Sequence, residues 1–519
     1  MLKQLRHWIV LALFGVNGFA VAALPPGLQN LTGELQVVPQ IILPSLDGAA
    51  LKARLAQNSG QPQPLIIAES ILTELLPAAG KWEPLNSGDW VWRLRLSSRQ
   101  AKSLHLRFED LTLPADAQLF VYSPGGADVR GPYTAADLTS ERKLWTPIVR
   151  GEELVIELVT PSATKEQVGF RITNVYFGFE EFWKQEEAPF KEGNCHIDVV
   201  CAAAAPYANE VRAVGRITFD IAGGILGIGA TTGLCSGQLL NNTASDNRQY
   251  FLTANHCISS AGGASSVVAY WNYQKSTCGG ANDGSQNDTQ VGGTTLRATS
   301  GGSDFTLLEF IRPLNSASNL FFSGWDRSEA PAGSAFTIHH PDGTEKRISF
   351  ENNPLQITSF SGTTSPGDGN ALRVVDWDMG STEPGSSGAG LWNAQHRVVG
   401  QLSQGRSACG NDESDWYGRF ARSWTGGGTS GSRLSNWLDP GNTGATLADG
   451  KNLSGSSVVI PPPQAAVDDD SGGGGCAIAG AQQPGNSLAA LLAVALLGFW
   501  RRRWLKASAP DTRSSFRIR

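Results

Sequence analysis

Residues 251–260 read FLTANHCISS, so a histidine and a cysteine follow directly after a short apolar run. A bounded run of this kind is typical of a buried strand, and His256 would then stand where that strand ends. Cys257 could tie the histidine to a neighbouring strand, and an imidazole held in place is what a general base requires. The alternative is a single polar residue at a strand end. This stretch alone does not decide between the two interpretations.

The sequence on both sides of this stretch carries further strand signals. They lie at 213–219, 266–273 and 397–403. Apolar runs bounded by glycine- and proline-containing turns are typical of β-proteins. Only one helix is expected between residues 192 and 450, near 433–438. Residues 192–450 are therefore predicted to form an all-β domain.

The segment before it, residues 23–191, has no cysteine and also has the pattern of strands. Apolar and polar residues alternate at 90–96 and 104–108, and strand-like runs follow at 118–122, 153–160 and 169–179. Such alternation indicates strands with one buried face, which would place His105 on the solvent side. The segment is predicted to be a β-sandwich.

Both ends of the chain carry processing signals. Residues 1–22 combine two basic residues, an apolar stretch and the small-residue end AVA, the pattern of a secretory signal peptide. Residues 451–475 are rich in proline, then aspartate, then glycine, a composition that cannot bury enough apolar area to fold and predicts a disordered linker.

The last segment, residues 476–519, holds an apolar run at 488–500 followed by three arginines. The run is shorter than the roughly 20 residues of a stable membrane span, so the alternatives are a simple anchor and a processed sorting signal. The glycines and Cys476 before the run resemble the GlyGly-type C-terminal signals of Gram-negative surface proteins, which a rhomboid-like intramembrane protease trims. That resemblance implies a segment transiently in the membrane, and a protein that passes the periplasm and is secreted or anchored at the outer surface of a Gram-negative-type cell.

The chain has seven cysteines, six of them between residues 195 and 409. Outside the cytoplasm they are expected to form a disulfide framework that leaves Cys476 over, although the sequence does not choose among the possible pairings. A formal net charge of -6 and only 17% charged residues give no reason to expect a polyanionic partner. Nucleic acid is therefore not an expected ligand.

A second candidate for chemistry is PGSSGAG, residues 384–390. A serine hydroxyl needs an adjacent base to act as a nucleophile, and the intermediate it forms needs N–H donors aimed at its oxyanion. Glycines on both sides of Ser387 would permit a tight backbone that points the N–H groups of Gly385 and Ser387 at one spot. The alternative is a flexible loop in a glycine-rich chain.

A third candidate is Asp304, at the head of the apolar run in SDFTLLEF. A carboxylate there could be partly buried against an imidazole, although most aspartates at strand starts are turn formers. The three candidates follow the chain order His256, Asp304, Ser387. That is the order of chymotrypsin-type enzymes and differs from those of α/β-hydrolases and subtilisins.

In these motifs and their order the chain resembles trypsin-fold serine endopeptidases, and among them the bacterial lysyl endopeptidases. The resemblance covers roughly 193–448, through the segments CHIDVVC, YFLTANHC, YWNYQKSTC, SDFTLLE, IHHPDGTEKRIS, EPGSSGAG and DWYGRF. It implies two six-stranded β-barrels with the catalytic groups in the cleft between them. It also implies protein or peptide substrates, a monomer, and no cofactor or metal.

The resemblance assigns roles to residues. His256 would be the general base, Asp304 its orienting carboxylate, Ser387 the nucleophile, and the N–H groups of Gly385 and Ser387 the oxyanion donors. Asp415 in SDWYGRF would be the acid of the S1 pocket with Glu383 close by, which favours cleavage after basic residues and lysine above arginine. The implied disulfides are Cys195–Cys409, Cys201–Cys278 and Cys235–Cys257. The alternative is a catalytically silent, protease-like surface binding protein or adhesin.

The residue before the nucleophile is Ser386, where animal trypsins carry an aspartate that pairs with the new N-terminal amine. That activation switch cannot operate here. The sandwich at 23–191 is instead expected to be a propeptide, with an accessory domain that stays attached as the alternative. Cleavage after Lys191 or Lys184, in the charged stretch before Cys195, would release it.

Overall fold

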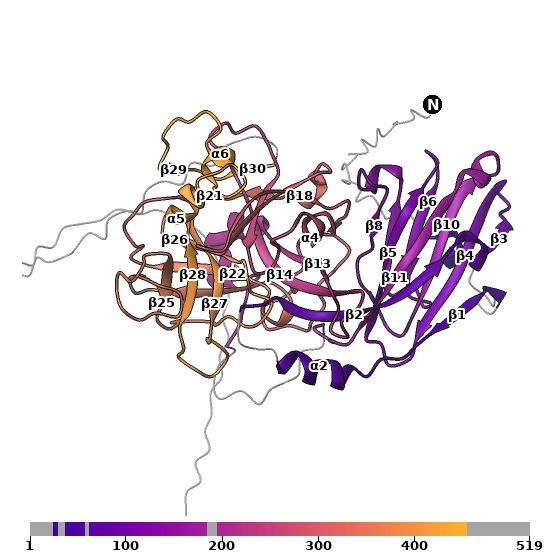
Figure 1. The fold of residues 1–519 in the computed structure, drawn as a ribbon, viewed down its shortest axis with the longest axis horizontal. Coiled ribbons are helices and arrows are strands. Elements are labelled where there is room, and N and C mark those ends of the chain that lie inside the picture. The colour runs from indigo at the N-terminus through magenta and orange to yellow at the C-terminus, as the bar shows by residue number, and fades with distance from the viewer. Residues whose placement is uncertain (1–23, 30–36, 58–61, 184–194, 454–519) are drawn as a thin grey trace, which may run out of the picture. The chain divides into compact units, whose positions relative to one another are not determined.

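The computed structural model describes residues 24–29, 37–57, 62–183 and 195–453. Within these ranges the chain consists mainly of β-strands (Figure 1), so the prediction of an all-β chain is confirmed. The signal at 1–22, Lys184, Lys191 and the segment from 454 onward, Cys476 included, lie outside the described residues. The α-helices that the structure describes are α1 (Pro26–Gln29), α2 (Gly48–Ala56), α3 (Ala208–Ala213), α4 (Ala261–Ser265), α5 (Phe420–Thr425) and α6 (Ser435–Leu438).

Of these helices the sequence predicted only α6. The others between residues 195 and 453 are 5 or 6 residues long and α6 itself has 4, so none of them is long enough to show the period of 3.6 residues that identifies a helix. No helix in the described ranges is long and apolar enough to cross a membrane.

The N-terminal part forms a sandwich of two sheets. The first has the order β1-β4-β10-β6-β7, with β3 on β4. The second contains β2, β11, β5, β8 and β9. The bounds are β1 (Gln40–Leu43), β2 (Leu65–Leu75), β3 (Lys81–Pro84), β4 (Asp89–Ser98), β5 (Ser103–Thr112), β6 (Gln118–Tyr122), β7 (Val129–Tyr133), β8 (Leu144–Trp145), β9 (Val149–Arg150), β10 (Glu153–Pro161) and β11 (Gly169–Gly178). The predicted strands between residues 90 and 179 match β4, β5, β6, β10 and β11.

The sandwich shares a sheet with the rest of the chain. Strand β2 pairs with β11 on one side and, antiparallel, with β14 (Ala230–Leu240) on the other, placing Leu65 opposite Leu234. The apolar core of the sandwich accordingly includes Leu234 and Tyr270 from the second half of the chain. The two halves are therefore joined by backbone hydrogen bonds as well as by packing.

Polar side chains of the sandwich also meet the second half. The Tyr176 hydroxyl and the Trp145 indole donate to the same oxygen of Asp220, at 2.6 and 2.7 Å. His105 lies 2.9 Å from the Thr232 hydroxyl, stacks on Tyr176 and is only 5% exposed. The prediction that His105 faces solvent is therefore wrong. The alternation of apolar and polar residues showed on which side of the strand His105 lies, but not that the second half of the chain covers that side.

Residues 195–453 form two groups of strands. The first has the order β17-β16-β13-β14-β15-β19-β18 and encloses an apolar core that contains Phe251, Trp271 and Leu308. Its strands are β13 (Val214–Ala222), β14, β15 (Tyr250–Ala254), β16 (Val268–Tyr270), β17 (Thr289–Gln290), β18 (Thr294–Ser300) and β19 (Phe305–Phe310).

The second group has the order β12-β23-β22-β26-β27-β28-β25-β24, with β21 beside β27 and β29 beside β21. Its strands are β12 (Ile197–Asp198), β21 (Gly324–Asp326), β22 (Ala335–His339), β23 (Arg347–Glu351), β24 (Gln356–Thr358), β25 (Ala371–Val374), β26 (Gly390–Asn393), β27 (Arg397–Gly405), β28 (Asp415–Arg419) and β29 (Leu447–Ala448). This is the two-barrel, chymotrypsin-like arrangement that the resemblance implies. Strands β20 (Phe321–Phe322) and β30 (Lys451–Asn452) pair with each other, so folded chain extends past the linker boundary predicted at 451.

Candidate active site

His256 and Asp304 are brought together by the first barrel. Strands β15 and β19 pair antiparallel with Ala254 opposite Phe305, so the residues that flank this pair lie side by side. Asp304 Oδ2 is 2.8 Å from His256 Nδ1, and its Oδ1 accepts the His256 backbone N–H at 2.9 Å. The two side chains are only 9% and 10% exposed. An imidazole whose Nδ1–H donates a hydrogen bond to the carboxylate keeps Nε2 free of a proton and available as a base.

The Ser387 loop packs against the strands that lead to this pair. The Ser236 backbone N–H donates to the Ser387 carbonyl at 2.8 Å, and the Ser236 hydroxyl donates to the Gly385 carbonyl at 3.0 Å. Gly388 has a φ of +84°, and a Cβ there would lie 2.2 Å from Thr253 Oγ1 and 2.9 Å from the Ala254 nitrogen. Glycine is therefore required for the loop to approach the end of β15.

Ser387 itself is partly exposed. Among the described residues no hydrogen bond joins it to His256, whose Nε2 lies 3.8 Å from Cys257 Sγ. In enzymes without bound substrate the hydrogen bond between nucleophile and base is often long and tightens in the complex. The structure thus joins His256 to Asp304 directly, and the Ser387 loop approaches the end of β15, the strand that leads to His256.

Two backbone donors beside Ser387 are free. In the described part of the chain the N–H groups of Gly385 and Ser387 make no hydrogen bond, whereas the N–H of Ser386 between them donates to the Glu383 carbonyl at 3.0 Å. Gly385 has a φ of +93°, which favours glycine at this position. A pair of free donors flanking a serine can hold an oxyanion.

Asp415, the predicted pocket acid, begins β28 and is 1% exposed. Its Oδ2 accepts the Trp377 indole N–H at 2.8 Å and the Thr382 hydroxyl at 2.7 Å. Its Oδ1 is buried and has no hydrogen-bond partner in the described ranges. Burial raises the pKa of Asp415 to about 6, against the lowering effect of its hydrogen bonds.

Glu383, the second predicted carboxylate, lies four residues before Ser387. Its Oε1 accepts the Cys409 backbone N–H at 2.7 Å. Burial raises the pKa of Glu383 to about 7, and the charges of Asp342 and Asp415 add to the rise. The structure therefore places the two carboxylates within electrostatic reach of each other.

Three disulfide bonds cross-link this region: Cys195–Cys409, Cys201–Cys278 and Cys235–Cys257. They are the pairs that the resemblance implies. Cys235–Cys257 ties the residue after His256 to β14, so the imidazole loop is held covalently. Cys195–Cys409 anchors the residue whose N–H binds Glu383.

Two segments of the chain match known protein families. Residues 191–418 match the family described as lysyl endopeptidase, C-terminal domain, and residues 44–175 match lysyl endopeptidase N-terminal domain. A lysyl endopeptidase of Pseudomonas aeruginosa is 28% identical over 395 residues, which cover 72% of this chain and 82% of that protein. The chain is a serine endopeptidase of the lysyl endopeptidase family.

Solved structures are also similar to this endopeptidase. A thermostable serine protease, AL20, from an extremophilic microorganism matches with a TM-score of 0.27 and 12% identity, over 41% of this chain and 92% of that one. A serine endoprotease from Yersinia pestis matches with a TM-score of 0.27 and 17% identity, over 41% of this chain and 60% of that one.

Two clusters of cysteine and histidine in the endopeptidase have the proximity of metal ligands. They are Cys195, His196 and Cys409, and Cys235, His256 and Cys257. In both clusters the two cysteines are bonded to each other, so neither offers the thiolate that binds a metal.

The residues that hold Asp415 were not identified from the sequence. Trp377 and Thr382 lie 38 and 33 residues before it in the chain, and neither stands in a pattern that indicates a pocket. A buried carboxylate needs hydrogen-bond donors, but the sequence does not say which strands will supply them.

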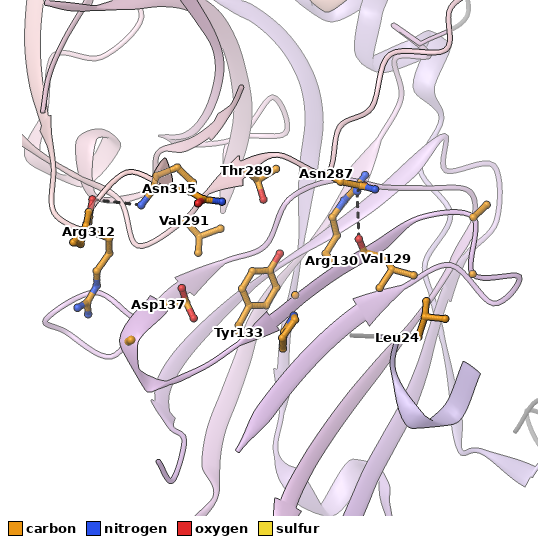
Figure 2. A pocket seen from close by; sticks show the side chains of 17 residues that line it. Leu24, Val129, Arg130, Tyr133, Asp137, Asn287, Thr289, Val291, Arg312 and Asn315 are labelled. Carbon is orange, nitrogen blue, oxygen red and sulfur yellow. Dashed lines mark hydrogen bonds between the residues drawn. The ribbon is translucent and has the colours of Figure 1, made fainter. Parts of the chain in front are cut away.

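A cavity lies away from these residues, between the sandwich and the first barrel (Figure 2). It has a volume of about 600 Å³ and includes Tyr133, Arg130 and Asn287, with Arg130 hydrogen-bonded to the Asn287 side chain. None of the predicted catalytic or pocket residues lines it. A second cavity of about 500 Å³ is lined by Pro64 and Trp145 of the sandwich and by His256.

Proposed function

We propose that this endopeptidase cleaves peptide bonds after lysine through an acyl-enzyme formed on Ser387. His256 takes the Ser387 proton as the oxygen attacks the carbonyl, and later returns a proton to the leaving amine. Asp304 holds the imidazole with Nε2 facing the serine and stabilises the imidazolium. The observation that carries the proposal is the 2.8 Å contact between His256 and Asp304, next to a serine loop with two free N–H groups.

The oxyanion would be bound by the N–H groups of Gly385 and Ser387. Charge builds on the carbonyl oxygen only as the tetrahedral intermediate forms, so donors that are already oriented stabilise that state more than the substrate. The absence of acceptors for these two groups in the described chain is consistent with this role.

The proposed preference for lysine rests on the buried carboxylate of Asp415. Its unpartnered Oδ1 lies beside Gly405, where a Cβ would approach this oxygen to 1.7 Å. A compact ammonium can bind one buried oxygen, whereas a planar guanidinium requires room for a two-oxygen contact. The relative from Pseudomonas aeruginosa is itself named a lysyl endopeptidase.

Digestion of an unstructured polypeptide tests this function. Mass spectrometry of the products should show cleavage after lysine in large excess over arginine. Labelling of Ser387 by an organophosphonate should accompany the activity. An unlabelled Ser387 and no cleavage in processed protein would favour the alternative of a silent surface binding protein.

Asp415→Asn is expected to lower kcat/KM for lysine substrates by roughly 10²- to 10³-fold, because an ammonium buried without its partner charge loses several kcal/mol. Labelling of Ser387 by a small uncharged sulfonyl fluoride should continue, since that reagent does not use the S1 charge. Glu383→Gln is the matched variant. It keeps the shape of the side chain and leaves Asp415 unchanged, so its effect should be smaller. Unchanged lysine cleavage by Asp415→Asn would show that the pocket is elsewhere.

The pH dependence of kcat/KM should reflect these carboxylates. With pKa values raised to about 6 for Asp415 and about 7 for Glu383, both groups lose their charge as the pH falls from 7 to 5, and the attraction for lysine falls with it. Sulfonyl fluoride labelling measures the triad without the S1 charge. The ratio of lysine kcat/KM to the labelling rate should therefore fall below pH 7, and a constant ratio would contradict the assignment.

The sandwich at 23–191 is proposed to be a propeptide. Its strand β2 is paired to β14 as far as Leu234, one residue before Cys235, and Pro64, just ahead of β2, lines the cavity that contains His256. A substrate segment approaching His256 from that side would meet the sandwich. Cleavage after Lys191 would sever the covalent link and leave the pairing of β2 with β14, the shared core and the contacts to Asp220 and Thr232 to hold the two parts.

The signal peptide and the C-terminal segment are proposed to direct the monomeric enzyme through the periplasm to the outer surface, where it acts on proteins or peptides. N-terminal and C-terminal sequencing of protein recovered from the cell surface and from the medium would test both ends. A retained segment 1–22 or an intact C-terminus at 519 would contradict the respective assignment.

A further inference from the structure

Beneath the Ser387 loop lies His339, the last residue of β22, which no part of the proposed chemistry uses. It is 0% exposed, and the sequence indicated only a structural role for the pair His339 and His340. Its Nδ1 is 2.8 Å from the Ser386 hydroxyl, and its Nε2 is 3.2 Å from the Ser349 hydroxyl. A buried histidine with both nitrogens engaged by serines connects the residue before the nucleophile to the barrel.

The hydrogen bonds of the two serines determine where the protons lie. The Ser349 hydroxyl donates to the Ser381 carbonyl at 2.9 Å, so its oxygen accepts a hydrogen bond from the N–H of His339 Nε2. His339 Nδ1 is then an acceptor, and the Ser386 hydroxyl donates to it. The Ser386 oxygen in turn accepts the Glu383 N–H at 3.2 Å. Each hydroxyl donates once and accepts once.

This chain of hydrogen bonds begins and ends on the same loop. It starts at the N–H of Glu383, passes through Ser386, His339 and Ser349, and returns to the carbonyl of Ser381. The same loop carries two groups of the proposed function: the Glu383 carboxylate, proposed for the S1 pocket, and the Gly385 N–H, proposed as an oxyanion donor. The arrangement requires a neutral imidazole, and burial lowers the pKa of His339 well below its ordinary value.

We infer that His339 and Ser386 are positioning residues that hold the 381–387 loop in the conformation that presents the oxyanion donors. Neither touches the substrate. The inference rests on the proposed function, since it gives the loop a part in lysine cleavage. It also supplies a physical reason why Ser386 can stand where trypsins use an aspartate and an N-terminal amine, because the anchoring group is a side chain of the barrel itself.

The contribution can be measured with Ser386→Ala and His339→Gln in the full chain, with enzyme concentration set by organophosphonate titration. Each variant should lower kcat by roughly 10- to 100-fold, less than the 10²- to 10³-fold of losing one oxyanion donor outright, and leave KM within about threefold. Binding of a peptide aldehyde ending in lysine should weaken in parallel with kcat/KM, because the aldehyde adduct uses the oxyanion donors. Inhibition by n-pentylamine, which needs only the S1 carboxylates, should change little.

The control is Ser323→Ala, which removes a fully buried hydroxyl that bonds Trp392 outside the loop. It should lose comparable thermal stability without the loss of kcat. Because one chain of hydrogen bonds is proposed, the double variant should be no slower than the slower single variant. A parent enzyme that does not cleave after lysine would refute the proposed function. An active parent whose kcat and aldehyde affinity survive Ser386→Ala, or His339→Gln if the first variant does not fold, would refute this inference.

Discussion

Ser387→Ala is expected to reduce peptide hydrolysis by roughly 10⁴- to 10⁶-fold, to the small rate that binding and the oxyanion donors alone sustain. The substitution removes only the hydroxyl group. The loop is held by other contacts: the Ser387 carbonyl accepts the Ser236 N–H, and Gly388 packs against β15. The fold should therefore persist. The measurement is hydrolysis of a lysine ester and a lysine peptide, with thermal unfolding to show that the variant is folded.

The same variant tests maturation. If the enzyme releases its own propeptide, Ser387→Ala made alone should accumulate with residues 23–191 attached, and a trace of active enzyme should trim it after Lys191. Ser323→Ala, made in the same way, should mature unaided. Spontaneous trimming of Ser387→Ala, or a mature N-terminus that does not follow a lysine, would overturn self-activation.

Asp304→Asn is expected to lower kcat by roughly 10⁴-fold near neutral pH. The asparagine amide can donate to His256 Nδ1, which then becomes the acceptor and moves the imidazole proton to Nε2, so the base can no longer take the serine proton. The carboxylate that would stabilise the imidazolium is lost as well. The measurement is kcat for a lysine peptide at pH 7, with binding of n-pentylamine as a check that the S1 pocket is intact.

Part of the Asp304→Asn defect should be recovered at high pH, because hydroxide can replace the missing base. A variant that retains more than about a tenth of the parental kcat would contradict the role of Asp304. A variant that loses n-pentylamine binding to the same extent as kcat would instead indicate a collapsed pocket, since the side chains of Asp304 and Asp415 share no hydrogen-bond partner among the described residues.

Much of the strand structure could be predicted because a strand's residues alternate between two faces with a period of two. The patterns at 118–122 and 153–160 correspond to β6 and β10 almost residue for residue. Short helices such as α5, and the pairing of β2 with β14, left no such pattern. Pairing between strands distant in sequence depends on which edges remain open after each half has folded.

The exposure of His105 could not be predicted from the local sequence pattern. Its strand and its side of the sheet were predicted correctly, yet its exposure was not, because the solvent side of an isolated sheet becomes an interior when the barrel's Thr232 and Asp220 pack onto it. The same packing turns Tyr176 and Trp145 into donors for Asp220.

The sequence by itself determined the order His256, Asp304, Ser387, the glycines around the nucleophile, the oxidised cysteines and the strand-rich class, since each of these depends on residue type and local spacing. Only the tertiary structure decided which groups meet. Asp415 with Trp377 and Thr382, Ser386 with His339, and β2 with β14 are contacts between residues that lie 33 or more positions apart. Such contacts are selected by strand register and by the burial of whole sheets, and these depend on the entire folded chain.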